Sequence, residues 1–330
     1  MSAFIDGHDV VMFDLDGVLY LGPDAVEGAV EGVNELVRRG VRPTYVTNNA
    51  ARAVEQVAEH LAGLGYPAAP EDVISSAQAA AALVAEEYPD GATVLVVGTQ
   101  NLVDLVTEAG LTPVATADDA PDLVVQGYDP NMTWPRLEEA GFAIQNGARW
   151  IATNTDATRP TNRGIVPGLG TMVHAVRVTV DVEPTVVGKP HKPLMAAAIK
   201  RTGARRPVFV GDRIDTDIMG AHAVGIDSFF VFTGAHGVRD VCLAPENGRP
   251  TAIGWNVASL FEPQRVATLD AAGAVCGGVR VRGVAGEPVL EGDLSTRDAQ
   301  LNAAWALAQL VWAGSVAWSD AVGARLDLLP

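Results

Sequence analysis

Two aspartates near the start of the chain, Asp14 and Asp16, follow the apolar run Val10 to Phe13. The β-strand period of two directs both side chains to one side of the strand end. Open α/β folds bind ligands at the carboxyl edge of the sheet. Adjacent carboxylates repel each other unless a hard cation or a shared proton compensates, and Mg²⁺ takes such oxygen ligands. The pair implies a metal, although an ordinary Asp-Gly turn after a strand explains the same residues.

A second acidic group follows another apolar strand, in Val210-Gly-Asp-Arg-Ile-Asp-Thr-Asp217. Asp215 and Asp217 suit a helix N-terminus, where the helix dipole favours negative charge. Asp212 stands directly at the strand end, where it can converge with Asp14 and Asp16. We therefore expect Asp212 to be a further metal ligand, and Asp217 either to support the ligands from behind or to cap the helix.

Polar groups also end two other predicted strands. Thr47-Asn48-Asn49 closes one strand and is expected to open a helix, which would offer an anion a hydroxyl, side-chain amides and backbone N–H groups. A simple Thr/Asn cap has the same geometry. Lys189, in Val187-Gly-Lys-Pro190, follows a short strand and would by itself be read as a surface lysine in a proline-rich turn.

Short β-branched runs alternate with helical periods along most of the chain, which predicts parallel strands with crossover helices. The expected strands include 10–13, 41–46 and 208–210, and the expected helices include 26–37, 54–64, 193–202 and 217–224. The fold class is therefore α/β, a doubly wound Rossmann-like core.

Breaks in this pattern predict the domain organisation. Residues 1–77 and 185–260 are expected to form the core, with Val186 and Val187 leading back to its sheet, and residues 78–184 to form an inserted α/β domain. Residues 261–330 are expected to be a small α+β extension. In it, strand candidates at 265–269 and 275–282 precede a helix capped by Ser295-x-x-Asp298.

Composition excludes several classes of protein. The 330 residues exceed the roughly 250 at which a single core stops growing, and a net charge of −17 disfavours nucleic acid and anionic lipid. The two cysteines and six histidines show no zinc spacing, so neither zinc nor a disulfide framework is expected. We expect no membrane insertion and a cytoplasmic location, since no signal-peptide pattern opens the chain.

The four polar segments, in this order and at strand ends, resemble the motifs of the haloacid dehalogenase superfamily of phosphohydrolases over Val10 to Phe232. The resemblance implies that Asp14 attacks phosphorus and that Asp16 protonates the leaving alkoxide and then activates water. It implies that Thr47 and Lys189 bind the phosphoryl oxygens. It also implies that Mg²⁺ is held by Asp14, the Asp16 backbone carbonyl and Asp212. Phosphatases of this superfamily keep an acid at the position of Asp16, whereas dehalogenases lack it.

The insertion resembles the large α/β cap of the branch that includes p-nitrophenyl-phosphatase-like, phosphoglycolate and glycerol phosphate phosphatases. The segments that carry this resemblance are 152–160 and 167–170. It implies that Arg159, and with it Asp156, contacts the polar end of a small phosphorylated metabolite. Pairing of Arg159 with a surface acid is the alternative. Glycerol 3-phosphate is the leading substrate, ahead of phosphoglycolate and pyridoxal phosphate, and a non-catalytic phospho-ligand sensor is the rival class.

The tail resembles the extra C-terminal piece of the glycerol 3-phosphate phosphatase subset and, loosely, an acetyltransferase fragment. Arg280-x-x-Gly283-x-Ala285 is similar to an acetyl-coenzyme A loop, but Glu287 to Leu290 follows where a helix should begin. We therefore expect no transferase activity. Structural packing or a contact between copies is expected instead, through Trp305, Trp312 and Trp318, and a homo-oligomer through the cap or the extension is left open.

Overall fold

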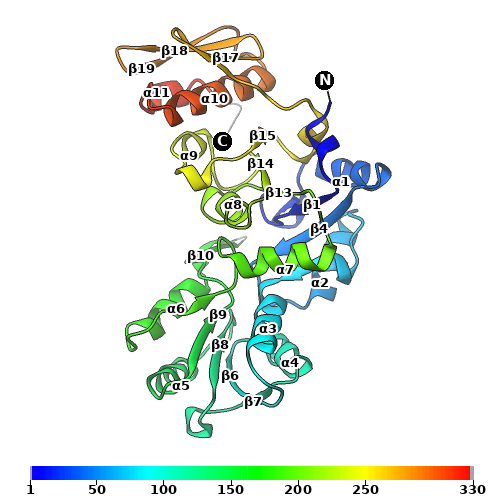
Figure 1. The fold of residues 1–330 in the computed structure, drawn as a ribbon, viewed down its shortest axis with the longest axis vertical. Helices are drawn as coiled ribbons and strands as arrows, with labels where there is room; N and C mark the ends of the chain where they lie inside the picture. The colour runs from blue at the N-terminus through cyan, green and yellow to red at the C-terminus, as the bar shows by residue number, and fades with distance from the viewer. Residues whose placement is uncertain (1, 162, 328–330) are drawn as a thin grey trace. The chain divides into compact units, whose positions relative to one another are not determined.

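Parallel strands flanked by helices make up most of the chain, as the alternating pattern predicts (Figure 1). The computed structural model describes residues 2–161 and 163–327. By its internal contacts the chain divides into two units. The first comprises the chain up to Pro43, Leu64–Pro67 and the chain from Ala204 onward, and the second comprises Thr44–Gly63 and Ala68–Gly203.

The first unit contains four parallel strands in the order β15-β14-β13-β1. These strands are β1 (Val10–Phe13), β13 (Pro207–Gly211), β14 (Asp227–Val231) and β15 (Ala252–Gly254). Every residue of β1 and β13 is buried, which explains why both read as continuous apolar runs. The helices of this part are α1 (Ala29–Arg38), α8 (Met219–Val224) and α9 (Val238–Cys242), and a short hairpin joins β2 (Tyr20–Leu21) to β3 (Asp24–Ala25).

The second unit begins within β4 (Arg42–Thr47), which pairs in parallel with β5 (Val73–Ser75). Between them lies α2 (Val54–Gly63), and β5 leads into α3 (Ser76–Glu87). A reciprocal capping box starts α3: the Gln78 N–H donates to Ser75 Oγ at 3.2 Å, and Gln78 Oε1 accepts from the Ser75 N–H at 3.3 Å.

A separate five-stranded parallel sheet follows in the order β12-β9-β8-β6-β7. Its strands are β6 (Thr93–Val97), β7 (Thr112–Val114), β8 (Leu123–Gln126), β9 (Arg149–Ala152) and β12 (Thr185–Val186). The accompanying helices are α4 (Gln100–Glu108), α5 (Trp134–Gln145), α6 (Leu169–Arg177) and α7 (Lys192–Thr202), and β10 (Thr158–Thr161) forms a hairpin with β11 (Gly164–Pro167).

One strand lies in a different sheet from the one expected. The sequence predicted that Val186 and Val187 lead back to the first sheet, but Thr185 and Val186 pair with Ile151 and Ala152 of β9. The apolar pattern of so short a strand carries no information about which sheet it joins. The division into core, cap and extension stays a prediction.

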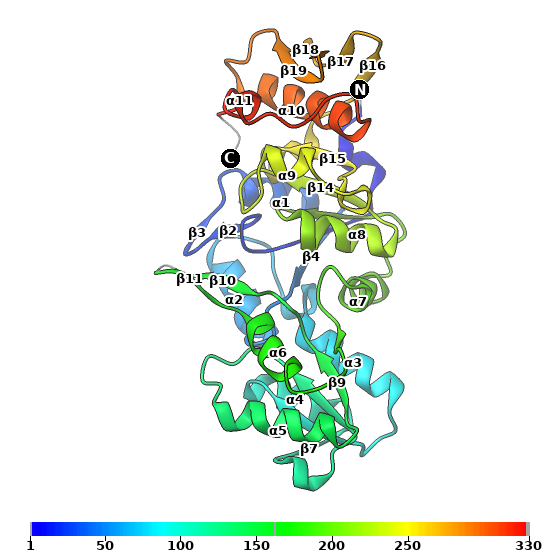
Figure 2. The same ribbon diagram turned by 90° about the vertical axis from the view of Figure 1, so that its left-hand side faces the viewer.

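The C-terminal residues form an antiparallel sheet that covers α10 (Arg297–Trp312) (Figures 1 and 2). The strands are β16 (Thr268–Asp270), β17 (Gly273–Cys276), β18 (Val279–Val284) and β19 (Glu287–Glu291), and α11 (Asp320–Gly323) follows α10. We call residues 268–327 the C-terminal layer. The strand predicted over 265–269 begins later, and the segment 275–282 divides at Gly277 and Gly278, both with positive φ, into β17 and β18.

The C-terminal layer and the parallel strands of the first unit share one hydrophobic core. Buried residues of α10, among them Leu301 and Leu307, belong to the same cluster as Phe230 of β14 and Val241 of α9. Structural packing, one of the two roles expected for the tail tryptophans, is observed at Trp305, which is only 6% exposed. Its ring meets that of Trp312 edge to face at 5.5 Å between centroids.

The predicted N-terminal cap of α10 is wrong in detail. Thr296, not Ser295, is the N-cap, and its Oγ1 accepts the Ala299 N–H at 3.2 Å. Ser295 instead donates its backbone N–H to Asp293 Oδ1 at 2.9 Å. Residues 287–290 lie in β19, in agreement with the expectation that no helix begins there. Among the described residues, no helix is long and apolar enough to cross a membrane.

Candidate active site

Asp14 and Asp212 follow the paired strands β1 and β13, as the sequence predicted. The Asp14 N–H donates to the Val210 carbonyl at 2.9 Å, so the ladder between these strands continues up to the first aspartate. Asp212 is only 2% exposed, whereas Asp14 is partly exposed. The carboxyl ends of adjacent parallel strands thus supply two carboxylates to one edge of the sheet.

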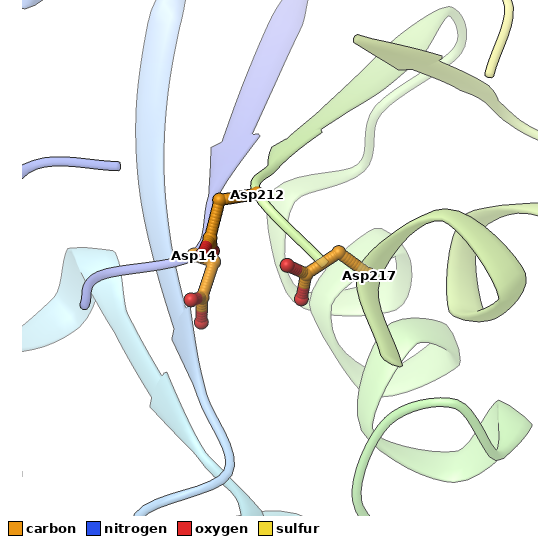
Figure 3. A group of neighbouring side chains, drawn as sticks. All are labelled: Asp14, Asp212 and Asp217. Carbon is orange, nitrogen blue, oxygen red and sulfur yellow. The ribbon is translucent and has the colours of Figure 1, made fainter. Parts of the chain in front are cut away.

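A π-helical turn, Ile214–Ile218, places Asp217 near Asp14 and Asp212. The N–H groups of Asp217 and Ile218 both donate to the Arg213 carbonyl, at 3.0 and 3.2 Å, and the extra residue in this turn re-aims the side chain that follows. The Arg213 N–H in turn donates to Asp217 Oδ2 at 3.1 Å. Asp217 is fully buried, and its carboxylate points toward the strand ends (Figure 3).

Asp14, Asp212 and Asp217 each offer one carboxylate oxygen, and these oxygens lie within 4.8 Å of one another. Three negative charges this close, two of them buried, require a compensating cation or protonation. Oxygen donors in this number fit Mg²⁺, which binds through one or two carboxylates and otherwise keeps water or substrate oxygens. The residues present therefore fit the metal that the sequence implied, with Asp217 as an additional candidate ligand.

A loop after β14 contacts the acidic cluster and the turn that follows β1. The Ala235 N–H donates to Asp212 Oδ2 at 2.6 Å, and Thr233 Oγ1 donates to the Gly17 carbonyl at 2.6 Å. A Cβ on Gly17 would lie 2.6 Å from Asp212 Oδ2, and one on Gly234 only 2.0 Å from it. Glycine is therefore required at both positions by the close approach of Asp212. Thr233-Gly234 was the sequence signal for this loop, and it was missed.

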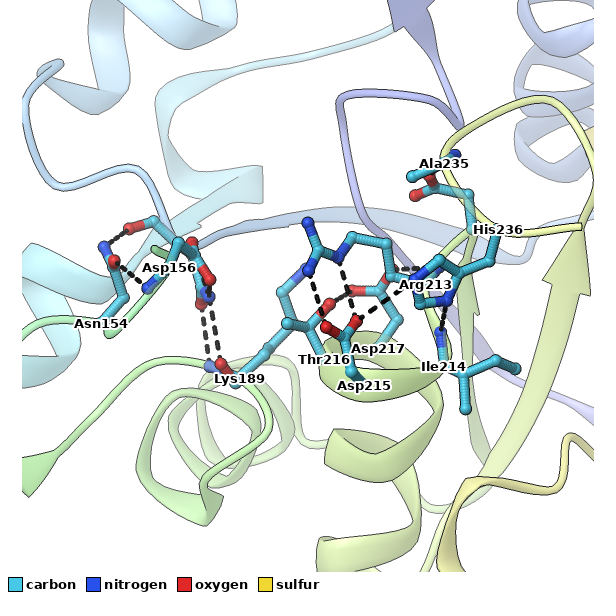
Figure 4. A network of polar contacts seen from close by, with 12 residues as sticks. Asn154, Asp156, Lys189, Arg213, Ile214, Asp215, Thr216, Asp217, Ala235 and His236 are labelled. Carbon is cyan, nitrogen blue, oxygen red and sulfur yellow. Dashed lines mark hydrogen bonds and ion pairs between the residues drawn. The ribbon is translucent and has the colours of Figure 1, made fainter. Parts of the chain in front are cut away.

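His236 is a second residue that the sequence reasoning missed. Its Nδ1 lies 2.9 Å from the backbone N of Ile214, which must donate, so the ring proton of the neutral imidazole resides on Nε2 (Figure 4). Nε2 lies 3.9 Å from Asp215 Oδ1. His236 therefore joins the loop after β14 to the turn that carries Asp217.

Asp215 is held by Arg213 through two hydrogen bonds, of 3.0 and 2.7 Å. Partial burial raises the pKa of Asp215, but the hydrogen bonds and charge of the Arg213 guanidinium outweigh this effect and leave that pKa below its ordinary value. Asp215 is therefore ionised and is engaged by Arg213, while Asp217 takes the position near the other acids.

Asp16 lies beyond the end of β1 and is exposed. The turn that carries it is closed by the Gly17 N–H, which donates to the Tyr20 carbonyl at 2.9 Å. Asp16 does not belong to the group of acids around Asp14. An exposed carboxyl group beside a buried acidic cluster is suited to proton transfer with a bound molecule.

The segment Thr47-Asn48-Asn49 forms turns instead of a helix start. Thr47 Oγ1 accepts the Asn49 N–H at 3.0 Å, and Asn49 Oδ1 accepts the Ala51 N–H at 2.9 Å. The expectation that a helix opens here is wrong, because α2 begins only at Val54. Short Thr and Asn side chains compete for backbone N–H groups and stabilise turns in place of helix.

Lys189 is not a surface lysine, being only 3% exposed. The Lys189 N–H donates to Asn48 Oδ1 at 2.8 Å, and Asn48 Nδ2 donates to the Lys189 carbonyl at 3.1 Å. Asn48 Nδ2 also lies 3.2 Å from Asp156 Oδ2. The second unit therefore brings together Asn48, Asp156 and Lys189, which are far apart in the sequence. Figure 4 shows two of them, Asp156 and Lys189.

Arg159 lies on the β10–β11 hairpin and is exposed. The contact that the structure gives it is to an aromatic side chain and not to a surface acid: Arg159 Nε donates to the Tyr128 hydroxyl at 3.0 Å. Its guanidinium also stacks over the Tyr128 ring, 5.0 Å from the centroid. Whether Arg159 meets a substrate stays a prediction.

The glycines of Gly168-Leu-Gly170 allow close packing of the backbone. A Cβ on Gly168 would lie 2.2 Å from the Asp156 carbonyl oxygen, and one on Gly170 would lie 2.2 Å from that of Thr155. The Gly170 N–H donates to the Asp156 carbonyl at 2.9 Å. The start of α6 is thereby packed directly onto the loop that contains Asp156.

Comparisons with known proteins agree with this geometry. A family model described as haloacid dehalogenase-like hydrolase matches residues 11–112, and a second model of the same kind matches residues 186–260. The chain is 43% identical over 266 residues to a D-glycerol 3-phosphate phosphatase of Mycobacterium tuberculosis, which covers 81% of this chain and 74% of that protein. It is 39% identical to an acid sugar phosphatase of Staphylococcus aureus over 71% of this chain and 90% of that one.

Solved structures show the same relationship. A crystal structure of glycerol phosphate phosphatase from Mycobacterium tuberculosis in complex with magnesium superposes with a TM-score of 0.88 at 38% identity, covering 100% of this chain and 99% of that one. A p-nitrophenyl phosphatase from Archaeoglobus fulgidus covers 77% of this chain and 98% of its own, with a TM-score of 0.71 and 28% identity. The acids at the strand ends, the two family models and these relatives together show that the chain belongs to the haloacid dehalogenase-like hydrolases.

Proposed function

We propose that this protein is a magnesium-dependent phosphatase that hydrolyses small phosphate monoesters through an aspartyl phosphate formed on Asp14. The observation that carries the proposal is the cluster of Asp14, Asp212 and Asp217 at the ends of parallel strands. Related phosphatases and a magnesium complex in the same fold support the reaction class and the metal.

The proposed chemistry proceeds in two displacements. A carboxylate oxygen of Asp14 attacks phosphorus, the bond from phosphorus to the ester oxygen breaks, and Asp16 gives its proton to the departing alkoxide. Asp16 then takes a proton from water, whose oxygen attacks the phosphoryl group. The Asp14–phosphorus bond breaks, and inorganic phosphate and the free carboxylate result. One acid thus acts first as proton donor and then as base.

The remaining residues bind and neutralise charge. Mg²⁺, held by Asp14, Asp212 and the Asp16 backbone carbonyl, would offset the charge of the phosphoryl oxygens, with Asp217 as a fourth candidate ligand. Thr47 and Lys189 would contact the phosphoryl oxygens. Lys189 is suited to this because a buried ammonium group acts more strongly on a nearby anion than an exposed one.

The substrate that we favour is glycerol 3-phosphate, ahead of phosphoglycolate and pyridoxal phosphate. The support is the relationship to glycerol phosphate phosphatases along the chain. We further propose that residues 78–184 act as the cap that selects the leaving group, with Arg159 contacting its polar end. An exposed guanidinium stacked on Tyr128 can donate to hydroxyl or carboxylate oxygens.

A panel of phosphorylated metabolites tests the proposal, with Asp14→Asn as the blank. We expect Mg²⁺-dependent release of phosphate, with the highest kcat/KM for glycerol 3-phosphate and a lower value for p-nitrophenyl phosphate. Turnover of another ester at a higher kcat/KM would reassign the substrate but keep the reaction. Absence of turnover for every ester, together with binding of one of them, would favour the non-catalytic sensor.

A further inference from the structure

Asn48 makes a set of contacts that uses its whole side-chain amide. Its Oδ1 accepts the Lys189 N–H at 2.8 Å, while Nδ2 donates to the Lys189 carbonyl at 3.1 Å and to the Asp156 carboxylate at 3.2 and 3.3 Å. A backbone N–H requires an acceptor and a backbone carbonyl requires a donor. Only one orientation of the amide therefore satisfies Lys189, and both Nδ2 hydrogens are then engaged.

The backbone of Asn48 is held as tightly as its side chain. The Asn48 carbonyl accepts hydrogen bonds from Ser76 Oγ and Asn154 Nδ2, each at 2.6 Å. A Cβ on Gly188 would lie 2.7 Å from both Asn48 Oδ1 and the Thr153 carbonyl oxygen. Because the residue before Lys189 touches Asn48 directly, the position of the lysine backbone depends on this asparagine.

Asp156 is fixed from the other side. Its backbone N–H donates to Asn154 Oδ1 at 3.1 Å, and its carbonyl accepts the Gly170 N–H of α6 at 2.9 Å. Its carboxylate accepts from Asn48 Nδ2. The loop that the sequence placed at the substrate is therefore tied to the lysine backbone through one side chain, Asn48.

From these contacts we infer that Asn48 is a positioning residue: it sets Lys189 for contact with the phosphoryl group and links that lysine to the loop of Asp156. This inference rests on the proposed role of Lys189. It replaces the prediction that Asn48 and Asp156 bind substrate directly. An asparagine is required because the position needs one acceptor and two donated hydrogens, which neither aspartate nor alanine supplies.

Asn48→Asp tests the inference with almost no change of shape. The variant loses the donors to the Lys189 carbonyl and to Asp156 and places two carboxylates side by side, so the lysine backbone shifts. We expect kcat to fall about 100-fold for p-nitrophenyl phosphate and glycerol 3-phosphate alike, with KM nearly unchanged, because misalignment of a reacting group costs about this much. A matched control is Asn146→Asp, the same chemical change at an exposed residue in the turn before β9.

A double variant that recovers kcat separates a positioning role of Asn48 from a general loss of stability. In Asn48→Asp/Asp156→Asn the amide at 156 can donate to the new carboxylate, and we expect at least about fivefold recovery of kcat at an unchanged Tm, a coupling of the size found for residues in direct contact. If Asn48→Asp does not fold, Asn48→Ala must show the same loss of kcat. Retention of kcat in Asn48→Ala, or the absence of recovery in the double variant, overturns the inference.

Lys189→Met, measured in the same assay, separates the proposed role of Lys189 from the positioning role of Asn48. If Lys189→Met keeps the wild-type kcat, the proposed role of Lys189 fails and takes this inference with it. If Lys189→Met loses turnover while the Asn48 variants keep it, the proposed function stands and the positioning role alone fails.

Discussion

Two groups of candidate functional residues, one in each unit, solve opposite electrostatic problems. Around Asp14 in the first unit, three carboxylates crowd together, and the arrangement needs a cation. In the second unit, the side-chain amide of Asn48 bonds to both the N–H and the carbonyl of Lys189 and so holds the main chain of the lysine. The first group is arranged to bind metal and the second to orient a cation of its own. Variants of the first group should therefore change the Mg²⁺ dependence of activity, and variants of the second should not.

Asp212→Asn should have the largest effect, because it removes one charged ligand from a buried cluster. We expect kcat/KM at fixed Mg²⁺ to fall about 10³-fold, since a bound metal supplies several kcal/mol of charge stabilisation. Activity should recover only at much higher Mg²⁺ in a titration of initial rates. An unchanged Mg²⁺ midpoint would remove Asp212 from the ligand set.

Lys189→Met should give the next largest effect and sharpen the contrast. Loss of one donor to a developing anion costs about 10²-fold to 10³-fold in kcat. The Mg²⁺ midpoint, measured in the same assay, should stay at the wild-type value. A midpoint shifted as far as in Asp212→Asn would mean that the two groups do not act separately.

Gly234→Ala tests the close approach of the loop after β14 to the metal site. A Cβ at this position would lie 2.0 Å from Asp212 Oδ2, so the carboxylate or the loop must move. We expect roughly 100-fold weaker Mg²⁺ binding, because mutating a group that orients a metal ligand lowers metal affinity by up to about this factor. Gly63→Ala is the matched control, because nothing outside its chain neighbours and its own helix backbone lies within 4 Å of the added Cβ.

His236→Ala should give a smaller shift in the same direction. The variant leaves the Ile214 N–H without its imidazole acceptor and loosens the turn that carries Asp217. We expect about 10-fold weaker Mg²⁺ binding at an unchanged KM. His236→Asn, whose amide oxygen can accept that N–H, should recover part of the affinity. Equal losses in both variants would count against the hydrogen bond as the cause.

Trp312→Phe should leave kcat and the Mg²⁺ midpoint unchanged. The indole N–H donates to the Val241 carbonyl at 3.1 Å, which joins the C-terminal layer to α9. Loss of this bond should lower the free energy of unfolding by about 1 kcal/mol in a urea titration. Trp134→Phe, at a residue that is 70% exposed, should change that free energy very little. A change in Mg²⁺ affinity would mean that the layer acts on the metal site.

The sequence predicted the acidic cluster in part, because strand ends are local features. Asp14 and Asp212 each follow a buried apolar run, and parallel strands bring such ends to one edge. The position of Asp217 depends on a π-helical turn, which adds one residue and has no apolar period of its own. The hydrogen bond from Ala235 to Asp212 joins residues that are 23 positions apart, and the neighbouring Gly234 allows the close approach. No local sequence pattern predicts such a contact.

The C-terminal layer was predicted less well for a different reason. Its strands are short and interrupted by glycine, so the period of two has little length in which to appear. Every residue of α10 from Gln300 to Ala308 is buried, because the helix lies between β17, β18 and α9. No stripe of this part of the helix faces solvent. A helix covered on several sides shows no amphipathic pattern that would indicate its partners.

Phosphorylation of Asp14 during turnover is the step on which the proposed mechanism depends. The most direct test is rapid acid quenching of the Asp16→Asn variant with p-nitrophenyl phosphate, followed by borohydride trapping and mass spectrometry of the peptide that contains Asp14. We expect the modification to lie on Asp14, to appear within the first turnover and to be absent from Asp14→Asn. Hydrolysis without any modified aspartate, or modification at another residue, would contradict it.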